Sequence, residues 1–338
     1  MATVQRRTDI VDASKGLGIL LMVIGHSGCP QWLHDFIYVF HMPLFFFLSG
    51  YCLKEYYLDN KALFVRKRMQ RIYWTFLKWN IVFFALNQLF FSIGITNEHY
   101  PLDSLPHIAL GLLTMGTWHE LLGPYWFLRY LLLCSFAVVF VSAGLRRYPK
   151  LCHALFLLMP VLPTALYILG YDSLKGQGLL CCFFYYCGFI LRDVQPHFHK
   201  LHFSIALALT VTASLFVKTE IPSMQPQLTL VYAIAALCGI YATTAACTWL
   251  FDRQALISST LAAIGRQTLT ILTWHLLAFK IVSAAIIGLW HIPADNMYGI
   301  IVDNKLTGSY TWIAYTIVGM AVPLALKAMS EKWKRSET

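Results

Sequence analysis

The chain has 338 residues, of which 58% are hydrophobic, 15% aromatic and only 12% charged. A soluble domain of this length needs more polar surface than such a composition supplies. The composition therefore excludes an ordinary soluble domain. It predicts an all-α, polytopic integral membrane protein, with membrane lipids as its surroundings.

Apolar runs long enough to form transmembrane helices recur along the chain, separated by short polar breaks. Ten spans with both termini in the cytoplasm are predicted, at 13–28, 36–53, 72–95, 125–145, 151–170, 178–191, 201–217, 227–250, 261–290 and 309–329. The run 178–191 is short, and the run 261–290 is long enough to be broken. The stretch from 107 to 124 is expected to be re-entrant or interfacial and is not counted.

The distribution of the 26 lysines and arginines agrees with this topology. Eighteen of them fall on the cytoplasmic side and four, Lys175, Lys218, Lys280 and Lys305, on the outer side. This asymmetry follows the positive-inside rule for membrane proteins. The net charge of +10 is thus a consequence of topology, and no nucleic-acid partner is expected.

A single membrane-embedded domain is expected to fill residues 1–338, with short cytoplasmic tails at 1–12 and 330–338 and no fused extracytoplasmic domain. The first span is not expected to be a cleavable signal peptide, because it lacks a small-residue cleavage site and a second span follows it directly. The nine cysteines lie mostly within spans and lack zinc-ligand spacing, so no metal site is expected.

Two histidines, His26 and His41, stand inside the apolar runs of the first two spans. His26 follows Lys15 by eleven residues, which on a helix brings both to one face with an axial separation of about 16 Å. Asp12 lies near the same face and can pair with Lys15. Because the second span returns from the outer side, the two imidazoles are expected at a similar depth. The four residues are therefore candidate catalytic groups, although a membrane histidine can also bond a neighbouring carbonyl.

The segment "KALFVRKRMQRIYW", residues 61–74, contains Arg68 and Arg71. Residues three apart share a face of a helix, where two guanidiniums can bind phosphate oxygens. A basic cytoplasmic loop is also expected from topology alone.

Three further polar and aromatic residues, Glu120, Trp126 and Arg129, flank the start of the span 125–145. Aromatic and carboxylate side chains near the outer mouth suit sugar rings and hydroxyls, so these residues are candidate substrate contacts. The alternative is an aromatic belt combined with a structural ion pair.

Five motifs occur in order between residues 9 and 275: "DIVDASKGLGILLMVIGH", "FHMPLFFFLSGY", "FVRKRMQRI", "YWFLRYLLL" and "IGRQTLTILTWH". With these motifs the chain resembles acyltransferase family 3 of membrane O-acyltransferases, particularly the branch of sugar O-acetylases similar to fucose 4-O-acetylase. The resemblance implies a ten-helix enzyme of the inner, cytoplasmic membrane. Such an enzyme moves an acyl group, acetyl above all, from cytoplasmic acyl-CoA to an envelope carbohydrate, either a polysaccharide or a lipid-linked glycan.

The resemblance also implies roles for individual residues. The basic residue that precedes the histidine of the first helix in the family corresponds to Lys15, where the family has arginine. The Arg-x-x-Arg pair corresponds to Arg68 and Arg71, and the terminal histidine of the last motif to His275. Many members continue the arginine pair with Ile-x-Pro, whereas this chain has Ile72-Tyr73-Trp74.

Transfer of an acyl group from a thioester to a hydroxyl needs a base and a group that stabilises the oxyanion. Imidazole titrates near neutrality, so His26 is the expected base, with His41 as second candidate or orienting partner. Arg68, Arg71 and Lys15 are expected to hold the phosphates of acetyl-CoA. Its pantetheine arm would then reach along the first helix toward His26.

Two other classes of function stay open on the residues alone. Buried histidine, lysine and aspartate also mark proton-coupled transporters or flippases of small polar solutes or glycans. A non-catalytic scaffold that binds lipid-linked glycans is the second alternative. Neither class requires acyl-CoA binding, which therefore discriminates between them and an acyltransferase.

Overall fold

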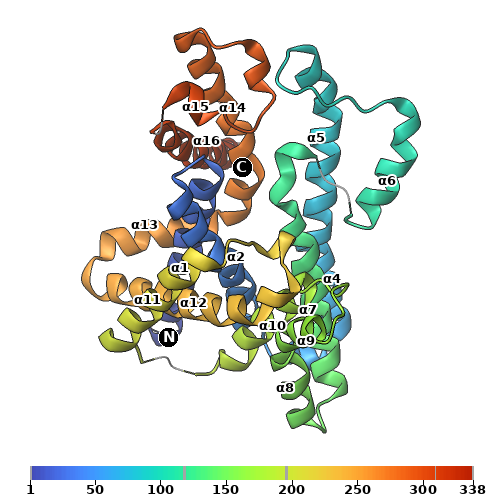
Figure 1. Cartoon of the computed structure of the whole chain (residues 1–338), viewed down its shortest axis with the longest axis vertical. Coiled ribbons are helices and arrows are strands. Elements are labelled where there is room, and N and C mark those ends of the chain that lie inside the picture. Colours follow the sequence, from blue (N-terminus) through green and yellow to red (C-terminus); the bar gives the residue numbers. More distant parts are fainter. Residues whose placement is uncertain (1, 117–118, 195–196, 309, 337–338) are drawn as a thin grey trace. The chain divides into compact units, whose positions relative to one another are not determined.

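The structure is a computed structural model that describes residues 2–116, 119–194, 197–308 and 310–336 (Figure 1). Every regular element in these ranges is helical, as the composition predicts. The chain divides into two compact units. Unit 1 comprises residues 1–18, 31–69 and 130–266, and unit 2 comprises residues 19–30, 70–129 and 267–338.

Helix α1 begins in unit 1 and ends in unit 2, whereas α7 begins in unit 2 and runs into unit 1. The two have the bounds Ala2–His26 and Trp126–Gly144. The other elements of unit 1 are α2 (Gln31–Tyr51), α3 (Tyr56–Asp59), α4 (Lys61–Arg68), α8 (Pro149–Leu157), α9 (Val161–Ile168), α10 (Gln177–Leu191), α11 (Lys200–Phe216), η4 (Ile221–Ser223), η5 (Pro226–Leu228), α12 (Thr229–Arg253) and α13 (Ala255–Arg266). Those of unit 2 are η1 (Met69–Tyr73), α5 (Trp74–Ser92), η2 (Leu102–Ser104), α6 (Leu105–Leu113), η3 (Glu120–Tyr125), α14 (Thr268–Trp290), η6 (Ala294–Met297), α15 (Asn304–Thr307) and α16 (Thr311–Ser336).

All ten predicted spans coincide with helical segments, but fewer of these segments have the length and hydropathy of a membrane span. Among the described residues, five segments meet both criteria: Gln31–Tyr51, Glu120–Gly144, Pro226–Arg253, Thr268–Trp290 and Thr311–Trp333. A sixth arises if the bent pair α8 and α9 is one span. Helices α10 and α11 are shorter, and α1 and α5 carry polar side chains such as Lys15 and Asn80. The chain is thus a multi-pass helical protein, and ten crossings stay a prediction.

Two of the predicted spans are broken. The range 151–170 forms α8 and α9, which meet at an angle of 59°. Pro160 lies at the bend, and a proline without an N–H cannot continue the helix ladder. The range 261–290 is divided between α13 and α14, with Gln267 between them. Thirty helical residues would extend about 45 Å, well beyond the thickness of a bilayer core of about 30 Å.

Unit 1 is built around the crossing of α2 and α10, where two glycines oppose each other. A Cβ on Gly50 would lie 1.8 Å from the carbonyl oxygen of Tyr185, and a Cβ on Gly188 would lie 1.9 Å from that of Phe47. Only glycine permits two helix backbones to approach so closely, as in other membrane helix pairs. Helices α1 and α13 approach each other in the same way, through Gly16 and Gly265.

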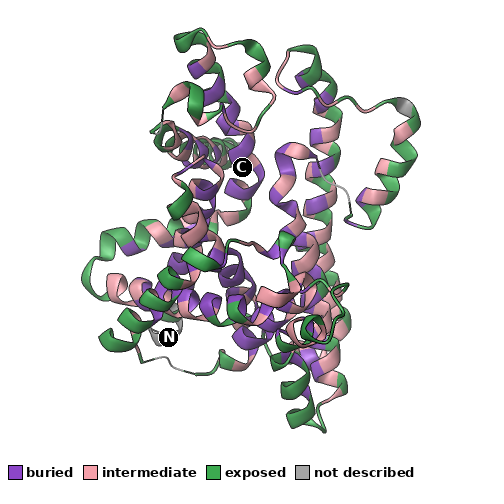
Figure 2. Ribbon diagram, in the orientation of Figure 1, coloured by how far each residue is buried: buried purple, intermediate pink, exposed green. Residues whose placement is uncertain are grey.

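Unit 2 is built around α14, which packs along α16 (Figure 1). Gly319 of α16 makes room for the ring of Phe279, because a Cβ there would lie 2.4 Å from the ring. Other helices bury little of their surface: α6 in unit 2 and α8 in unit 1 are mostly exposed (Figure 2). Their exposed side chains include Leu110 and Leu155, and hydrophobic exposure of this kind is typical of lipid-facing helices.

Candidate functional site

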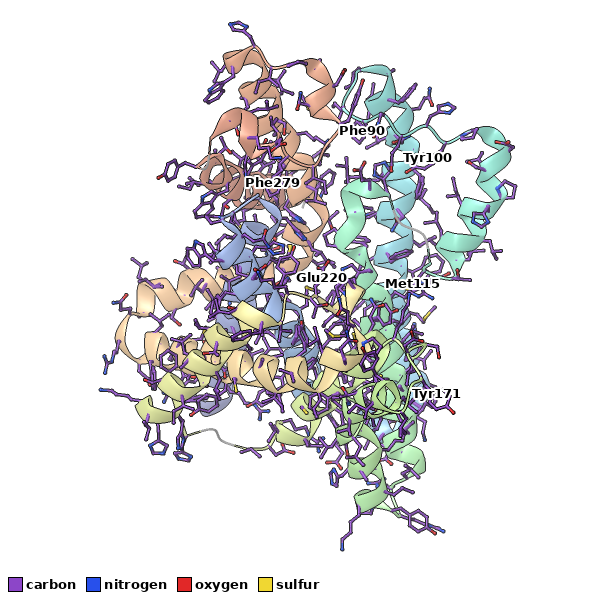
Figure 3. All side chains as sticks on the ribbon, viewed as in Figure 1. Phe90, Tyr100, Met115, Tyr171, Glu220 and Phe279 are labelled. Atoms are coloured by element: carbon purple, nitrogen blue, oxygen red, sulfur yellow. The ribbon has the colours of Figure 1, made fainter. Side chains whose placement is uncertain are left out.

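The imidazoles of His26 and His275 lie together in unit 2, at the end of α1 and in the middle of α14. His26 Nδ1 is 3.2 Å from His275 Nε2, and the two rings stack with centroids 5.3 Å apart. Phe279 meets the ring of His275 edge-on at 5.8 Å, and it is labelled in Figure 3. The first and last motifs of the sequence therefore meet through their terminal histidines.

Hydrogen bonds indicate which nitrogen of each ring carries the proton. His275 Nδ1 lies 2.9 Å from the carbonyl oxygen of Ile271 and 3.1 Å from that of Leu272. Carbonyl oxygens only accept, so Nδ1 carries the proton and Nε2 the lone pair. His26 Nδ1–H then donates to His275 Nε2, and the lone pair of the neutral His26 ring is on its Nε2. In this tautomer His26 can accept a proton at Nε2 while His275 orients the ring.

Other polar side chains of α14 connect it to further parts of unit 2. Thr273 donates to the carbonyl of Leu269 at 2.8 Å, so its contact of 2.7 Å with Tyr125 is a hydrogen bond that the tyrosine donates. Trp274 packs edge-on against Trp79 of α5, with ring centroids 5.1 Å apart. The residues next to His275 thus fix α14 against η3 and α5.

Lys280, which the predicted topology places on the outer side, is held by the segment that follows α14. The residue lies within α14 and is 5% exposed. Its ammonium donates to the carbonyls of Met297, Tyr298 and Gly299 at 2.7, 3.3 and 2.8 Å. A buried lysine needs such partners because an unpaired charge is costly to bury. Lys280 therefore holds the segment after α14.

A buried histidine, His119, holds η3 against α5. Its Nε2 lies 3.0 Å from Asn87 Oδ1, and its Nδ1 accepts the backbone N–H of Leu121 at 3.1 Å. Its own backbone N–H donates to Asn80 Oδ1 at 3.0 Å. The two asparagines are seven residues apart on α5 and so share one face. They fix the segment from which Glu120 and Trp126 project.

This buried histidine makes stability depend on pH. Burial is the main cause that lowers the pKa of His119 from 6.5 to about 4; the charge of Lys280 also lowers it, and Glu98 opposes the shift. The folded protein therefore binds this proton less readily than the unfolded chain, so the contribution is full above pH 6.5 and is lost as the pH falls toward 4. The shift corresponds to about 3 kcal/mol at most.

We expect His119→Gln to remove this part of the pH dependence. The free energy of unfolding in detergent, followed by tryptophan fluorescence between pH 7 and pH 4.5, should fall more steeply for the wild type than for the variant. Equal slopes would show that His119 is not the buried neutral group described above.

The three candidate substrate contacts lie on consecutive elements of unit 2. Glu120 begins η3, and Trp126 and Arg129 lie in the first turn of α7. Glu120 and Arg129 are half-buried, and neither forms a hydrogen bond or ion pair with another residue in the described part of the chain. The charges that act on Glu120 belong to Glu98 and Lys280. The assignment of these residues to the substrate, and the alternative of an aromatic belt combined with a structural ion pair, stay predictions.

In unit 1, Lys15 donates to Asp12 at 3.2 Å, as the sequence predicts. Asp12 also lies 3.9 Å from Arg266, the last residue of α13. One carboxylate therefore faces two cations, which leaves a net positive charge at this end of α1.

His41 lies in unit 1 and is almost completely buried in α2. Its Nδ1 is 2.9 Å from the carbonyl oxygen of Ile37, one turn earlier, so Nδ1 donates there and the lone pair is on Nε2. The ring of Tyr38 meets it edge-on at 4.8 Å. Within unit 2 the imidazole of His26 meets that of His275, and the expected similar depth of His26 and His41 stays a prediction.

The helical segment that carries Arg68 and Arg71 is interrupted. Arg68 is the last residue of α4 and belongs to unit 1, whereas Arg71 lies in the π-helix η1 and belongs to unit 2. A π-helix winds more residues into each turn than an α-helix does, so the spacing of a regular α-helix does not apply from Arg68 to Arg71. Joint binding of phosphate by the two arginines stays a prediction. Arg68 donates to the hydroxyl of Tyr185 at 2.7 Å, and Arg71 is exposed.

Several residues that build the site have no motif in the sequence. Asn80, Asn87 and His119 act through partners that are 32 or 39 residues away, and Lys280 through backbone carbonyls. Polar residues inside apolar runs were the one available signal. Within the described ranges no group of three or more histidine, cysteine, aspartate or glutamate residues is arranged to hold a metal ion.

The chain matches one known protein family over most of its length. A family described as acyltransferase domain, acyltransferase family 3, matches residues 9–328, nearly the whole chain. The comparisons with curated proteins and with solved structures gave no match.

Proposed function

Since the chain belongs to acyltransferase family 3, a family of membrane acyltransferases, we propose that it transfers an acetyl group from cytoplasmic acetyl-CoA to a hydroxyl of an envelope carbohydrate. The acceptor in this proposal is a polysaccharide or a lipid-linked glycan, and the enzyme lies in the inner membrane. The observation that carries the proposal is the contact between His26 and His275. An imidazole oriented by a hydrogen bond can act as the base that acyl transfer requires.

The reaction proceeds from this pair. His26 Nε2 removes the proton of the acceptor hydroxyl while its oxygen attacks the thioester carbonyl. The tetrahedral intermediate collapses, the carbon–sulfur bond breaks, and the imidazolium of His26 returns the proton to the thiolate of coenzyme A. His275 accepts the hydrogen bond of His26 Nδ1–H throughout, so it acts as a positioning residue. His41 is the second candidate for the base.

Donor binding is assigned to basic groups of unit 1. Arg68 is half-buried, is held by Tyr185 and forms no ion pair with a carboxylate in the described ranges, whereas Arg146 and Arg192 do. A guanidinium without a counter-ion suits a phosphate group. Lys15 with Asp12 lies on α1, eleven residues before His26. Glu120, Trp126, Arg129 and His275 are assigned to the acceptor side.

We expect wild-type protein to bind acetyl-CoA and Arg68→Ala to weaken this binding by roughly 10- to 100-fold, because a charge-assisted contact contributes about 1.5–3 kcal/mol. Titration calorimetry on protein in nanodiscs measures both affinities. Arg66→Ala is the control, since Arg66 is an exposed arginine of the same helix. A wild-type protein without affinity for acetyl-CoA would favour a transporter or scaffold. Equal affinities of Arg68→Ala and wild type would show that Arg68 does not bind the donor and only follows the charge bias of cytoplasmic loops.

A further inference from the structure

Unit 2 contains a groove between α5 and α6 that the proposed mechanism does not use. Its volume is about 310 Å³, at the lower end of the range of small-molecule sites. Each helix supplies one wall, and the walls include Ile81, Phe84 and Gln88 of α5 and Leu105, Ile108 and Leu112 of α6. Spacings of three and four residues place the members of each set on a common helix face. The groove is therefore enclosed by two faces that are mostly apolar.

The two helices run antiparallel, so the two ends of the groove can be told apart. Tyr73, directly before α5, donates its hydroxyl at 3.1 Å to the carbonyl of Leu113, the last residue of α6. Near the other end of α5, Asn87 donates at 2.9 Å to the carbonyl of Glu98, which precedes α6. The start of α6 therefore lies beside the end of α5 (Figure 1).

One end of the groove is polar and the other is apolar. Near the end of α5 the wall includes Asn87, Gln88 and Tyr100, of which Tyr100 is labelled in Figure 3. Toward the start of α5 the wall consists of hydrocarbon side chains such as Ile81 and Leu112. On the predicted topology α5 begins at the cytoplasmic side, so the polar end faces the outer side. This gradient suits an amphiphile whose chain points into the bilayer.

The charges around the polar end favour an uncharged headgroup. Among the described residues, no lysine or arginine lines the groove. Tyr100 donates to the carboxylate of Glu98 at 2.5 Å, and the charge of Glu120 acts on the same tyrosine. Lys280, whose charge acts on Glu120, is already bound by three backbone carbonyls. A phosphate group would therefore meet two carboxylates, which repel it.

The polar end adjoins the acceptor side of the candidate site. The ring of His119 meets that of Tyr100 with centroids 6.1 Å apart, and Glu120 follows His119 in the chain. Phe83 contacts both His119 and Trp274 of α14, at centroid distances of 5.8 and 5.6 Å. Aromatic contacts thus connect the groove with the helix that carries one histidine of the catalytic pair.

We propose that this groove binds the hydrocarbon chain of the acceptor, and that the acceptor is an uncharged glycolipid whose sugar lies at the polar end. The inference rests on the proposed function and deepens it, because it selects a lipid-linked acceptor without phosphate over a polysaccharide. Sugar hydroxyls can donate to the carboxylates of Glu98 and Glu120, and the chain is removed from water between two apolar faces. A bilayer phospholipid has the same chains, but its phosphate is repelled by these carboxylates.

Photo-crosslinking of the full-length protein in nanodiscs tests this assignment. Two probes carry the same diazirine-labelled acyl chains, one a glucosyl diacylglycerol and the other a phosphatidylglycerol. At equal amounts the glucosyl probe should label peptides of α5 and α6 roughly tenfold more than the phospholipid. Ala109→Trp, which fills the groove from α6, should reduce this labelling to the level of the phospholipid. The control Leu110→Trp, at an exposed position of α6 outside the groove, should match the wild type.

A second variant, Glu98→Gln, tests the selection against charge. The amide keeps an oxygen that accepts the hydrogen bond of Tyr100, but it removes one negative charge from the polar end. Labelling by the phospholipid should therefore rise by roughly threefold, while labelling by the glucosyl probe stays as in the wild type. An unchanged ratio of the two probes would overturn the selection of an uncharged headgroup.

The outcomes separate this inference from the proposed function, because labelling requires no acetyl-CoA. Equal labelling of the wild type by both probes would overturn the inference, and so would equal labelling of Ala109→Trp and Leu110→Trp by the glucosyl probe. If labelling is as expected but the wild type transfers no acetyl group to isolated envelope glycans, the groove binds a glycolipid and the proposed function itself fails.

Discussion

Replacement of His26 by alanine is expected to lower the rate of acyl transfer by roughly 10²–10⁴-fold while acetyl-CoA still binds. The rate falls because the variant lacks the lone pair that removes the hydroxyl proton. Binding persists because the assigned donor contacts, such as Arg68, belong to other elements of the chain. Transfer is measured as acetylation of isolated envelope glycans by protein in vesicles, and binding is measured by calorimetry.

Two further variants show whether the imidazole acts as a base. His26→Gln should fail as well, since an amide can keep a hydrogen bond to His275 but cannot take up a proton. His275→Phe should cost less and should displace the pH profile of the rate, because His26 would then lose the acceptor that sets its tautomer. A His26→Gln enzyme that works at close to the wild-type rate would make this imidazole structural. The base would then have to be sought at His41.

Substitution of Gly188 by alanine is expected to prevent unit 1 from folding. The new Cβ would lie 1.9 Å from the carbonyl oxygen of Phe47 and 2.8 Å from the backbone nitrogen of Tyr51. Backbone atoms of a neighbouring helix cannot move aside as a flexible side chain can, so α2 and α10 would have to separate. Overpacking usually costs about 1–3 kcal/mol, and a clash with backbone lies at the upper end or beyond. Size-exclusion chromatography in mild detergent should show loss of the monodisperse peak.

The matched control is Gly288→Ala in α14, where an added Cβ meets nothing within 4 Å. Alanine favours a helix over glycine by about 1 kcal/mol, so this variant should be as stable as the wild type or slightly more so. Equal behaviour of the two variants would show that the crossing of α2 and α10 is looser than described.

The positions of the helices could be predicted largely from hydropathy, whereas their continuity could not. All ten predicted ranges coincide with helical segments, apart from residue 309, which lies outside the described residues, yet 151–170 bends at Pro160 and 261–290 is interrupted at Gln267. A hydropathy run records how apolar a segment is and carries little information on where the backbone turns. Hydropathy likewise does not indicate the π-helix η1, which begins directly after Arg68 and contains Arg71.

The candidate site could be predicted only in part. The pairing of Lys15 with Asp12 is local and follows from helical spacing. The contact between His26 and His275 joins residues 249 positions apart, and only the resemblance to a family indicated His275. His119 and Lys280 could not be identified in advance, because their roles depend on partners from other elements. A lone histidine or lysine in a sequence does not show whether it is buried.

The most direct test of the account is mass spectrometry of envelope glycans from cells that carry the wild-type protein, His26→Gln or no copy of it. We expect glycans with one acetyl mass more in the wild type alone, and the unmodified mass in the other two. An acetyl mass that persists with His26→Gln would contradict the role of His26 as base. Glycans that are identical in all three strains would contradict transfer to an envelope carbohydrate.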